Sequence, residues 1–291
     1  MSDKPYLLHR PDRAESCVVF AVPHAGRAYP PQLLRETALP PNLLRSSEDA
    51  FVDLLFAPAP LHGAPLLVAQ YPRAWVDLNR AADELDPALI EGVTRGGLNP
   101  RIASGLGVIP RVVANGRSIY RGRLTRTEAD ARIDHAWRPY HAQLQTLLNG
   151  HRRRFGEAVL IDCHSMPHEA TDAFAHRRGR RPDVVLGDRY GASAAAEVVD
   201  GIEAILTDAG LSVARNSPFA GAFVAQHYGC PSVGQHVVQI EIDRSLYMDE
   251  KAIALRPDFE RVVDLWGRIV GRLARLRAGG ADLGSVPLAA E

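Results

Sequence analysis

The sequence predicts an α/β protein with a central β-sheet flanked by helices. Short apolar segments rich in β-branched residues alternate along the chain with helical patterns. The chain has 291 residues, 46% of them hydrophobic, which is enough to bury one large core. Three strand-like segments also end in residues that bind metals or transfer protons. Because strands of an open α/β sheet direct their carboxyl ends toward one crevice, these residues are expected to converge there.

The first half of the chain predicts three strands and one helix before a long loop. The strands are expected at Cys17–Val22, Pro65–Gln70 and Ala74–Leu78. The helix is expected over Ser47–Ala57, with its first residue as the N-cap and acidic residues in the first turn. The segment Ala81–Gly122 is rich in Gly, Pro and Asn, and a loop of this length is usually functional.

The second half predicts a helix over Leu124–Arg154, kinked or split at Pro139. The elements expected after it are a strand at Ala158–His164, a strand at Asp183–Asp188, a helix over Ser193–Ala209, a strand at Leu211–Asn216, a strand at Val237–Asp243 and a helix over Arg256–Ala278. Residues Gly279–Glu291 have the composition of a frayed tail. We therefore expect a single domain over residues 1–291, with its core at about 15–278.

Charge and cysteine content argue against several classes of protein. The 34 basic and 34 acidic residues give a formal net charge of zero, which does not fit a protein that binds nucleic acid or an anionic membrane. The three cysteines show no CxxC spacing, so neither a disulfide framework nor a thiolate zinc site is expected. No stretch reaches the roughly 18 apolar residues of a membrane-spanning helix, and the first residues lack a signal-peptide pattern. A cytoplasmic location is expected.

Two histidines at strand ends predict a metal site. His24 follows the first predicted strand, and His164 ends the segment AVLIDCH. Imidazole nitrogens bind zinc well, and catalytic zinc sites typically use three protein ligands. Asp49 and Glu48 are the nearest candidates for a carboxylate ligand, and Asp162 is expected to hydrogen-bond a ligand from behind. Either histidine alone would more often be a hydrogen-bonded core residue, but two at strand ends favour the metal site.

The third segment, HVVQIEIDR, supplies a candidate acid–base group. A partly buried glutamate beside a metal can take the proton of a water molecule and pass it to a leaving group. Glu241 fits this role. The alternative is that Glu241 forms only an ion pair with Arg244 or His236 at the end of the strand.

The segment WVDLNR supplies a candidate carboxylate-binding group. An arginine can hold a carboxylate through two parallel hydrogen bonds, which orients a substrate better than a lysine does. Arg80, with Asn79 beside it, is expected to orient a carboxylate-bearing substrate, and Arg244 is a candidate for a second carboxylate. The alternative for Arg80 is a surface ion pair with Asp77 or Asp83.

An ordered set of eight motifs resembles the N-formylglutamate amidohydrolase family. The motifs are VPHAGRAYP, SEDAFVDLL, VDLNRAADELDP, GVIPR, RPYH, DCHSMP, NSPFAGAFV and QIEIDRSLYMDE. They span about Val22–Glu250, and the last is the most specific. The resemblance implies a metal-dependent hydrolase with a mixed sheet, of the phosphorylase/hydrolase-like type found in zinc carboxypeptidases and aspartoacylases. It also implies release of formate and glutamate from N-formylglutamate in histidine degradation.

The resemblance also implies a ligand set. The wider relatives bind zinc through a His, a Glu three residues later and a distant second His. His24 matches the first and His164 the distant one, but Arg27 stands where the Glu would be. The carboxylate ligand is therefore assigned to Asp49, with Glu48 in reserve.

Further residues gain roles from the resemblance. Because VDLNR is similar to the DLNR element of aspartoacylases, Asn79 and Arg80 are expected to bind the substrate carboxylate. Glu241 is expected to be the general acid and base. Tyr247, close behind Arg244, is a candidate to hydrogen-bond the substrate, and a packed core tyrosine is the alternative.

Three functions remain open from the sequence. The leading one is hydrolysis of N-formyl-L-glutamate with one divalent metal ion, expected to be zinc because two His and a carboxylate favour it over magnesium. The second is zinc-dependent deacylation of another N-acyl amino acid or a short acyl peptide. The third is a non-catalytic α/β module that binds an anionic metabolite. The expected partner is a small anionic N-acyl amino acid, with neither nucleic acid nor membrane, and the sequence leaves the oligomeric state undetermined.

Overall fold

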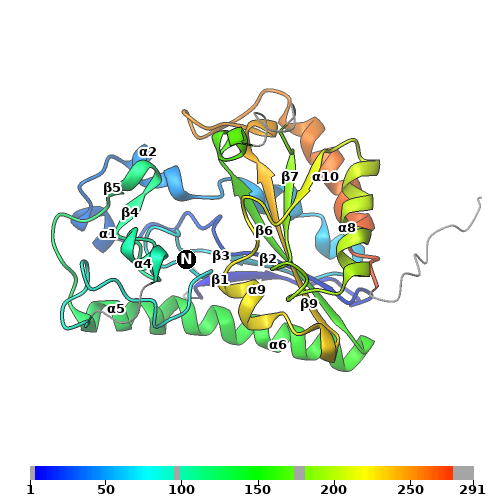
Figure 1. The fold of residues 1–291 in the computed structure, drawn as a ribbon, viewed down its shortest axis with the longest axis horizontal. Coiled ribbons are helices and arrows are strands. Elements are labelled where there is room, and N and C mark those ends of the chain that lie inside the picture. The colour runs from blue at the N-terminus through cyan, green and yellow to red at the C-terminus, as the bar shows by residue number, and fades with distance from the viewer. Residues whose placement is uncertain (1–3, 95–98, 174–180, 278–291) are drawn as a thin grey trace, which may run out of the picture.

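A seven-stranded mixed β-sheet forms the centre of the protein (Figure 1). The computed structural model describes residues 4–94, 99–173 and 181–277. The strands lie in the order β1-β3-β2-β6-β9-β7-β8. Their bounds are β1 Tyr6–His9, β2 Val18–Val22, β3 Leu66–Ala69, β6 Ala158–Met166, β7 Val184–Gly187, β8 Val213–Arg215 and β9 Gln235–Asp243. Strands β3, β2, β6 and β9 are parallel, whereas β1 and β7 pair antiparallel with β3 and β9. The predicted mixed sheet is confirmed.

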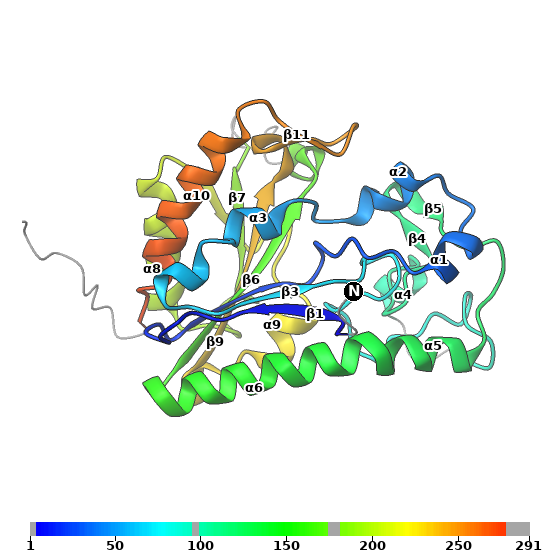
Figure 2. The same ribbon diagram turned by 180° about the vertical axis from the view of Figure 1, so that it is seen from behind.

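Helices cover both faces of the sheet (Figures 1 and 2). One face packs against α6 (Arg138–Phe155) and α9 (Phe223–Tyr228). The other packs against α3 (Val52–Phe56), α8 (Ala196–Asp208) and α10 (Phe259–Leu273). Alternate residues of β2 enter the two cores, as the period of a strand requires, and all five are buried.

Smaller elements gather beside one end of the sheet, on the left of Figure 1. They are α1 Pro31–Glu36, α2 Pro41–Leu44, α4 Pro100–Ala103, α5 Arg126–Arg132, β4 Val112–Val113 and β5 Arg117–Ser118. A second hairpin is formed by β10 Met248–Asp249 and β11 Ala254–Leu255. Single 3₁₀ turns lie at Arg45–Ser47, Ala59–His62, Ala114–Gly116, His168–Thr171, Pro231–Val233 and Arg244–Leu246. The segment expected as an irregular loop therefore contains α4, β4 and β5.

Two predictions in the first half were wrong. The helix expected over Ser47–Ala57 begins only at Val52, after Phe51 in the left-handed conformation with φ 67°, and Ser47 ends a 3₁₀ turn instead of capping the helix. The strand expected at Ala74–Leu78 is absent from the described residues. There the carbonyl of Pro72 accepts hydrogen bonds from the backbone N–H groups of Trp75 and Val76, which turns the chain.

The long helix is confirmed, with an interruption at the expected place. A capping box at Thr125 begins α5, a π-helical turn at Ile133–Trp137 follows, and α6 continues to Phe155. Pro139 lies in the first turn of α6, directly after the π-helical turn. The predicted tail at Gly279–Glu291 lies outside the described residues.

The two central strands carry polar side chains toward one edge of the sheet. β6 and β9 pair in register over their whole length, with His164 opposite Glu241 and Asp162 opposite Gln239. All four side chains are buried, on the same face as the apolar residues of the α6 side. The register therefore places a buried polar cluster at the carboxyl ends of the parallel strands.

Candidate metal centre and active-site cavity

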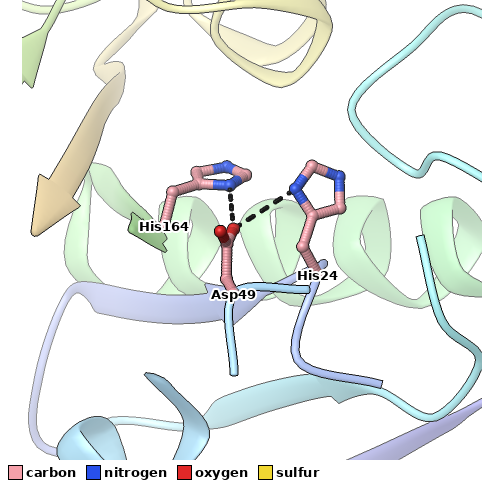
Figure 3. Close-up of side chains that lie close together, drawn as sticks. All are labelled: His24, Asp49 and His164. Atoms are coloured by element: carbon pink, nitrogen blue, oxygen red, sulfur yellow. Dashed lines mark hydrogen bonds and ion pairs between the residues drawn. The ribbon is translucent and has the colours of Figure 1, made fainter. Parts of the chain in front are cut away.

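Three buried side chains meet at the carboxyl edge of the sheet (Figure 3). His24 follows β2, Asp49 precedes α3, and His164 lies in β6. Their ligand atoms all lie within 4.8 Å of one another. The Oδ2 atom of Asp49 is 3.0 Å from Nδ1 of His164 and 3.4 Å from Nδ1 of His24. The structure thus brings together the three residues that the sequence predicted as metal ligands.

Each imidazole is held from behind by a second carboxylate. Nε2 of His24 lies 2.7 Å from Oδ1 of Asp77, and Nε2 of His164 lies 3.0 Å from Oδ2 of Asp162. A carboxylate on Nε2 keeps the proton there and leaves the lone pair of Nδ1 for a metal. Asp162 was predicted in this position. Asp77 was not, because the sequence suggested only an ion pair with Arg80 and could not place this aspartate beside His24.

The donor set fits a divalent cation. Two imidazole nitrogens and one carboxylate oxygen are the ligands of many catalytic zinc sites. Nδ1 of His24 is buried and makes no hydrogen bond to the described residues, a cost that a metal ion would remove. The other oxygen of Asp49 accepts hydrogen bonds from Ser165 and Arg244 at 3.1 Å each, which leaves Oδ2 for the imidazoles. The three side chains therefore form a candidate metal site.

The electrostatics of this cluster favour a positive charge. Burial alone would raise the pKa of Asp49, but its interactions with the imidazoles of His164 and His24 hold that pKa well below its usual range. Burial alone would lower the pKa of His164, but Asp162 and Asp49 raise it well above its usual range. Burial would also raise the pKa of Asp77, which the charges of neighbouring cations keep well below its usual range. Buried carboxylates thus stay ionised and attract either protons or a metal.

A cavity of about 650 Å³ lies in front of the cluster. His24, His164 and Glu241 line it, together with four arginines and the segment 218–222. Burial, with the charge of Asp49 as a smaller cause, raises the pKa of Glu241 to about 7. Among the described residues Glu241 forms no ion pair with Arg244, so its carboxylate remains available to the cavity. A larger cavity of about 1200 Å³ lies elsewhere and contains none of these groups.

Arg80 and Asn79 both line the cavity, and both are hydrogen-bonded within the protein. The Arg80 guanidinium donates to the carbonyls of Leu106 at 2.9 Å and of Asn79 at 2.7 Å, and its Nη2 makes no hydrogen bond to the described residues. Asp77 is 4.0 Å from Nε. The Asn79 amide contacts His164 Nε2 at 3.1 Å, and its oxygen accepts from the backbone of Val224 at 2.8 Å.

Arg244 supports the metal site more than it faces the cavity. Its three nitrogens donate to Ser165 Oγ at 3.1 Å, to Asp49 Oδ1 at 3.1 Å and to the carbonyl of Ser46 at 3.4 Å. The predicted second carboxylate would have to compete with these bonds.

Two other candidates lie away from the cavity. Tyr247 is fully buried in the hydrophobic core and does not line the cavity, which corresponds to the alternative of a packed tyrosine. Glu48, the reserve ligand, accepts hydrogen bonds from Arg45 at 3.1 Å and from the hydroxyl of Tyr29, and it is absent from the metal cluster.

Arg73 and Gln239 were missed by the sequence analysis. Nε of Arg73 donates to Oδ2 of Asp77 at 2.8 Å, and its terminal nitrogens make no hydrogen bond within the described part of the chain. Gln239 donates to Oε1 of Glu241 at 2.7 Å. Both line the cavity. Their proximity in sequence to WVDLNR and to Glu241 was the only available signal.

The fold and this site define a class of protein. Two strand-end histidines and an aspartate, with a buried glutamate in the same cavity, are typical of metal-dependent hydrolases. The chain belongs to the N-formylglutamate amidohydrolase family, since the model of that family matches residues 16–248.

Known proteins of similar sequence and structure agree with this assignment. The chain is 32% identical to an N-formylglutamate deformylase of Pseudomonas aeruginosa over 83% of this chain and 86% of that protein. It is 31% identical to an N-formylglutamate deformylase of Pseudomonas putida over 65% of this chain and 66% of that protein, just under two thirds of its length. The crystal structure of an N-formylglutamate amidohydrolase from Ralstonia eutropha superposes with a TM-score of 0.86 at 34% identity, covering 93% of this chain and 97% of that one.

In the part of the chain that the structure describes, no helix combines the length and the apolar character needed to cross a membrane.

Proposed function

We propose that this chain hydrolyses N-formyl-L-glutamate to formate and L-glutamate. The observation that carries the proposal is that both histidines of the metal cluster line one cavity together with Glu241 and Arg80. The names and sequence identities of the relatives support the same substrate. The metal cluster and the acid–base group suit cleavage of an amide, and the arginines suit a substrate with carboxylates.

We propose zinc as the bound ion. Two imidazoles and one carboxylate suit zinc better than magnesium, which prefers oxygen ligands and retained waters. When bound, such an ion lowers the pKa of a water molecule and polarises a carbonyl group. His24, Asp49 and His164 would hold the ion, and Asp77 and Asp162 would fix the two imidazole rings.

Glu241 would move the proton in this reaction. Its carboxylate takes a proton from the attacking water as the new C–O bond forms at the formyl carbon. It then gives that proton to the amide nitrogen as the C–N bond breaks, so that formate and the amino group of glutamate leave. A group with a pKa near the working pH suits both steps, and burial places the pKa of Glu241 at about 7.

The arginines would bind the substrate and its developing charge. The free Nη2 of Arg80 is suited to a substrate carboxylate. Arg73 lies close to the metal ligands, because the two oxygens of Asp77 bond Nε of Arg73 and Nε2 of His24. A fixed positive charge there stabilises negative charge on the carbonyl oxygen during the reaction.

A formate-release assay tests the proposal directly. The purified protein, with its metal content measured, is given N-formylglutamate, N-acetylaspartate and other N-acyl amino acids. We expect N-formylglutamate to be the best substrate, and a chelator that removes the metal to abolish turnover. Better turnover of another acyl amino acid would favour the wider deacylase function. A protein that binds these compounds without turnover and without stoichiometric metal would be a binding module.

Glu241→Gln is the variant that tests the proposed acid–base group. Turnover should fall by roughly 10²–10⁴-fold, because the amide cannot accept the proton. The metal content should stay at the wild-type level, since Glu241 is outside the ligand cluster. Turnover near that of the wild type would rule out the proposed role.

A further inference from the structure

Gln239 lies beside Glu241 on the same face of β9. The two residues are two positions apart in the strand, so their side chains point the same way. Both line the cavity, and Gln239 is 4% exposed. A buried primary amide needs partners for its oxygen and for its nitrogen, so its surroundings determine which way it faces.

A chain of hydrogen bonds determines the orientation of this amide. The backbone N–H of Val224 donates to Oδ1 of Asn79 at 2.8 Å, which turns Nδ2 of Asn79 toward the sheet. That nitrogen lies 3.3 Å from Oδ2 of Asp162 and 3.5 Å from Oε1 of Gln239. Nε2 of Gln239 then donates to Oε1 of Glu241 at 2.7 Å. If the amide of Gln239 were reversed, its N–H group would face the N–H group of Asn79, and its oxygen would face the carboxylate of Glu241.

The same chain links the glutamate to the metal cluster. Oδ2 of Asp162, which accepts from Nδ2 of Asn79 at 3.3 Å, also bonds Nε2 of His164 at 3.0 Å. Glu241 and a metal ligand are therefore both connected to the amide of Asn79. The Oε2 atom of Glu241 makes no hydrogen bond to the described residues, so only Oε1 is held.

We propose that Gln239 is a positioning residue for Glu241. It holds Oε1 and thereby directs Oε2 toward the water and the substrate nitrogen. The proposal rests on the proposed function, because it assigns Gln239 to the acid–base group of that reaction. A glutamate side chain has three rotatable bonds, and a displacement of about 1 Å can cost about 10²-fold in rate. Gln239 would act through Glu241 and would not touch the substrate.

The test is a double-mutant cycle measured on the metal-loaded protein. Gln239→Met removes the hydrogen-bond donor at similar volume. Alone it should lower kcat by about 10- to 100-fold, with KM changed less than about twofold and metal content unchanged. In the Glu241→Gln background the same substitution should change kcat by less than about twofold, because the group it positions is already inactive. Gln226→Met on the exposed side of α9 is the matched control and should leave kcat unchanged.

A second variant keeps the test informative if Gln239→Met does not fold. Gln239→Glu retains size and polarity but, when ionised at alkaline pH, cannot donate to Glu241. Gln239→Glu should lower kcat by about 10- to 100-fold, as Gln239→Met does. Turnover near that of the wild type in either variant would overturn the inference.

The possible failures are distinguishable. Equal losses of kcat from Gln239→Met in both backgrounds would show that Gln239 does not act through Glu241. A higher KM with an unchanged kcat would show that Gln239 contacts the substrate instead. Both results overturn the inference and leave the proposed function intact. Wild-type turnover in Glu241→Gln would rule out Glu241 as the acid–base group and overturn the inference with it, whereas failure of the metal-loaded wild type to release formate from N-formylglutamate would contradict the proposed function.

Discussion

The two buried histidines of the metal cluster and the buried His141 of α6 have opposite chemistry. His24 and His164, at the carboxyl edge of the sheet, are 1% and 3% exposed, and each bonds a carboxylate through Nε2. His141, on α6, is 5% exposed and bonds only neutral groups. Its Nε2 lies 2.9 Å from the carbonyl of Leu78, and its Nδ1 lies 2.9 Å from the hydroxyl of Tyr228.

The surroundings of each group explain the difference. The His141 ring packs against Trp137, Phe223 and Tyr228, and burial there lowers its pKa to about 3. The pKa of the equally buried His164 is raised well above its usual range by the carboxylates around it. Burial alone therefore keeps a histidine neutral and structural. Nearby carboxylates convert an equally buried histidine into a site for a cation.

Removal of a metal ligand should give the largest effect. His164→Asn should lose the bound metal, and its activity should fall by more than about 100-fold. Removing a residue that only hydrogen-bonds a metal ligand already costs about 10–100-fold in affinity or activity, and removing the ligand itself should cost more. Metal analysis and the formate-release assay measure both quantities. His141→Gln is the matched control, and this variant should bind as much metal as the wild type. Full metal occupancy in His164→Asn would contradict the assigned cluster.

Removal of a carboxylate behind an imidazole should give a smaller effect. Asp77→Asn and Asp162→Asn should each weaken metal affinity by roughly 10–100-fold, since the amide no longer fixes the proton on Nε2. Competition with a chelator measures the affinity. Asp83→Asn, a substitution of the same type on a residue outside the metal cluster, is the control. An unchanged affinity in both site variants would mean that these carboxylates serve only folding.

The protonation of Glu241 should produce a pH dependence of the activity. The carboxylate form is the one that accepts a proton, so kcat/KM should fall about tenfold per pH unit below its pKa. Burial raises that pKa to about 7, and a bound cation lowers it, so the midpoint should lie at or below 7. The pH–rate profile of the metal-loaded protein measures it. A flat profile across this range would contradict the role of Glu241 as the base.

Much of the site was predictable because it depends on strand ends. His24, His164 and Glu241 each follow or end a strand-like run, and the parallel register of β6 with β9 places His164 opposite Glu241. The choice between Asp49 and Glu48 was not predictable from position alone. It is determined by tertiary contacts: the N–H of Asp49 donates to the carbonyl of His24 at 3.0 Å, while Glu48 pairs with Arg45.

The segment around Asp77 shows why the remainder was missed. Its composition is that of a strand, but Pro72 turns the chain, and the N–H of Asp77 donates to the carbonyl of Val108 at 2.7 Å. This turn places Asp77 against Nε2 of His24, and it also places Arg73 in the lining of the cavity. The local pattern carries no record of these distant contacts, so it predicted neither the turn nor the two roles.

The histidine packed on α6 should affect stability without affecting catalysis. The pKa of His141 is about 3 in the folded protein and about 6.5 in the unfolded chain, so between these values the unfolded chain binds the extra proton. The stabilising contribution of the neutral ring is complete above about 6.5 and is lost as the pH falls toward 3, at up to about 1.4 kcal/mol per pH unit. His141→Gln cannot titrate. The difference in unfolding free energy between wild type and variant, measured with denaturant, should therefore decrease as the pH is lowered from neutral. If the unfolding free energies of the two proteins changed with pH in parallel, His141 would not resist protonation. The contrast between His141 and the histidines of the metal cluster would then be wrong.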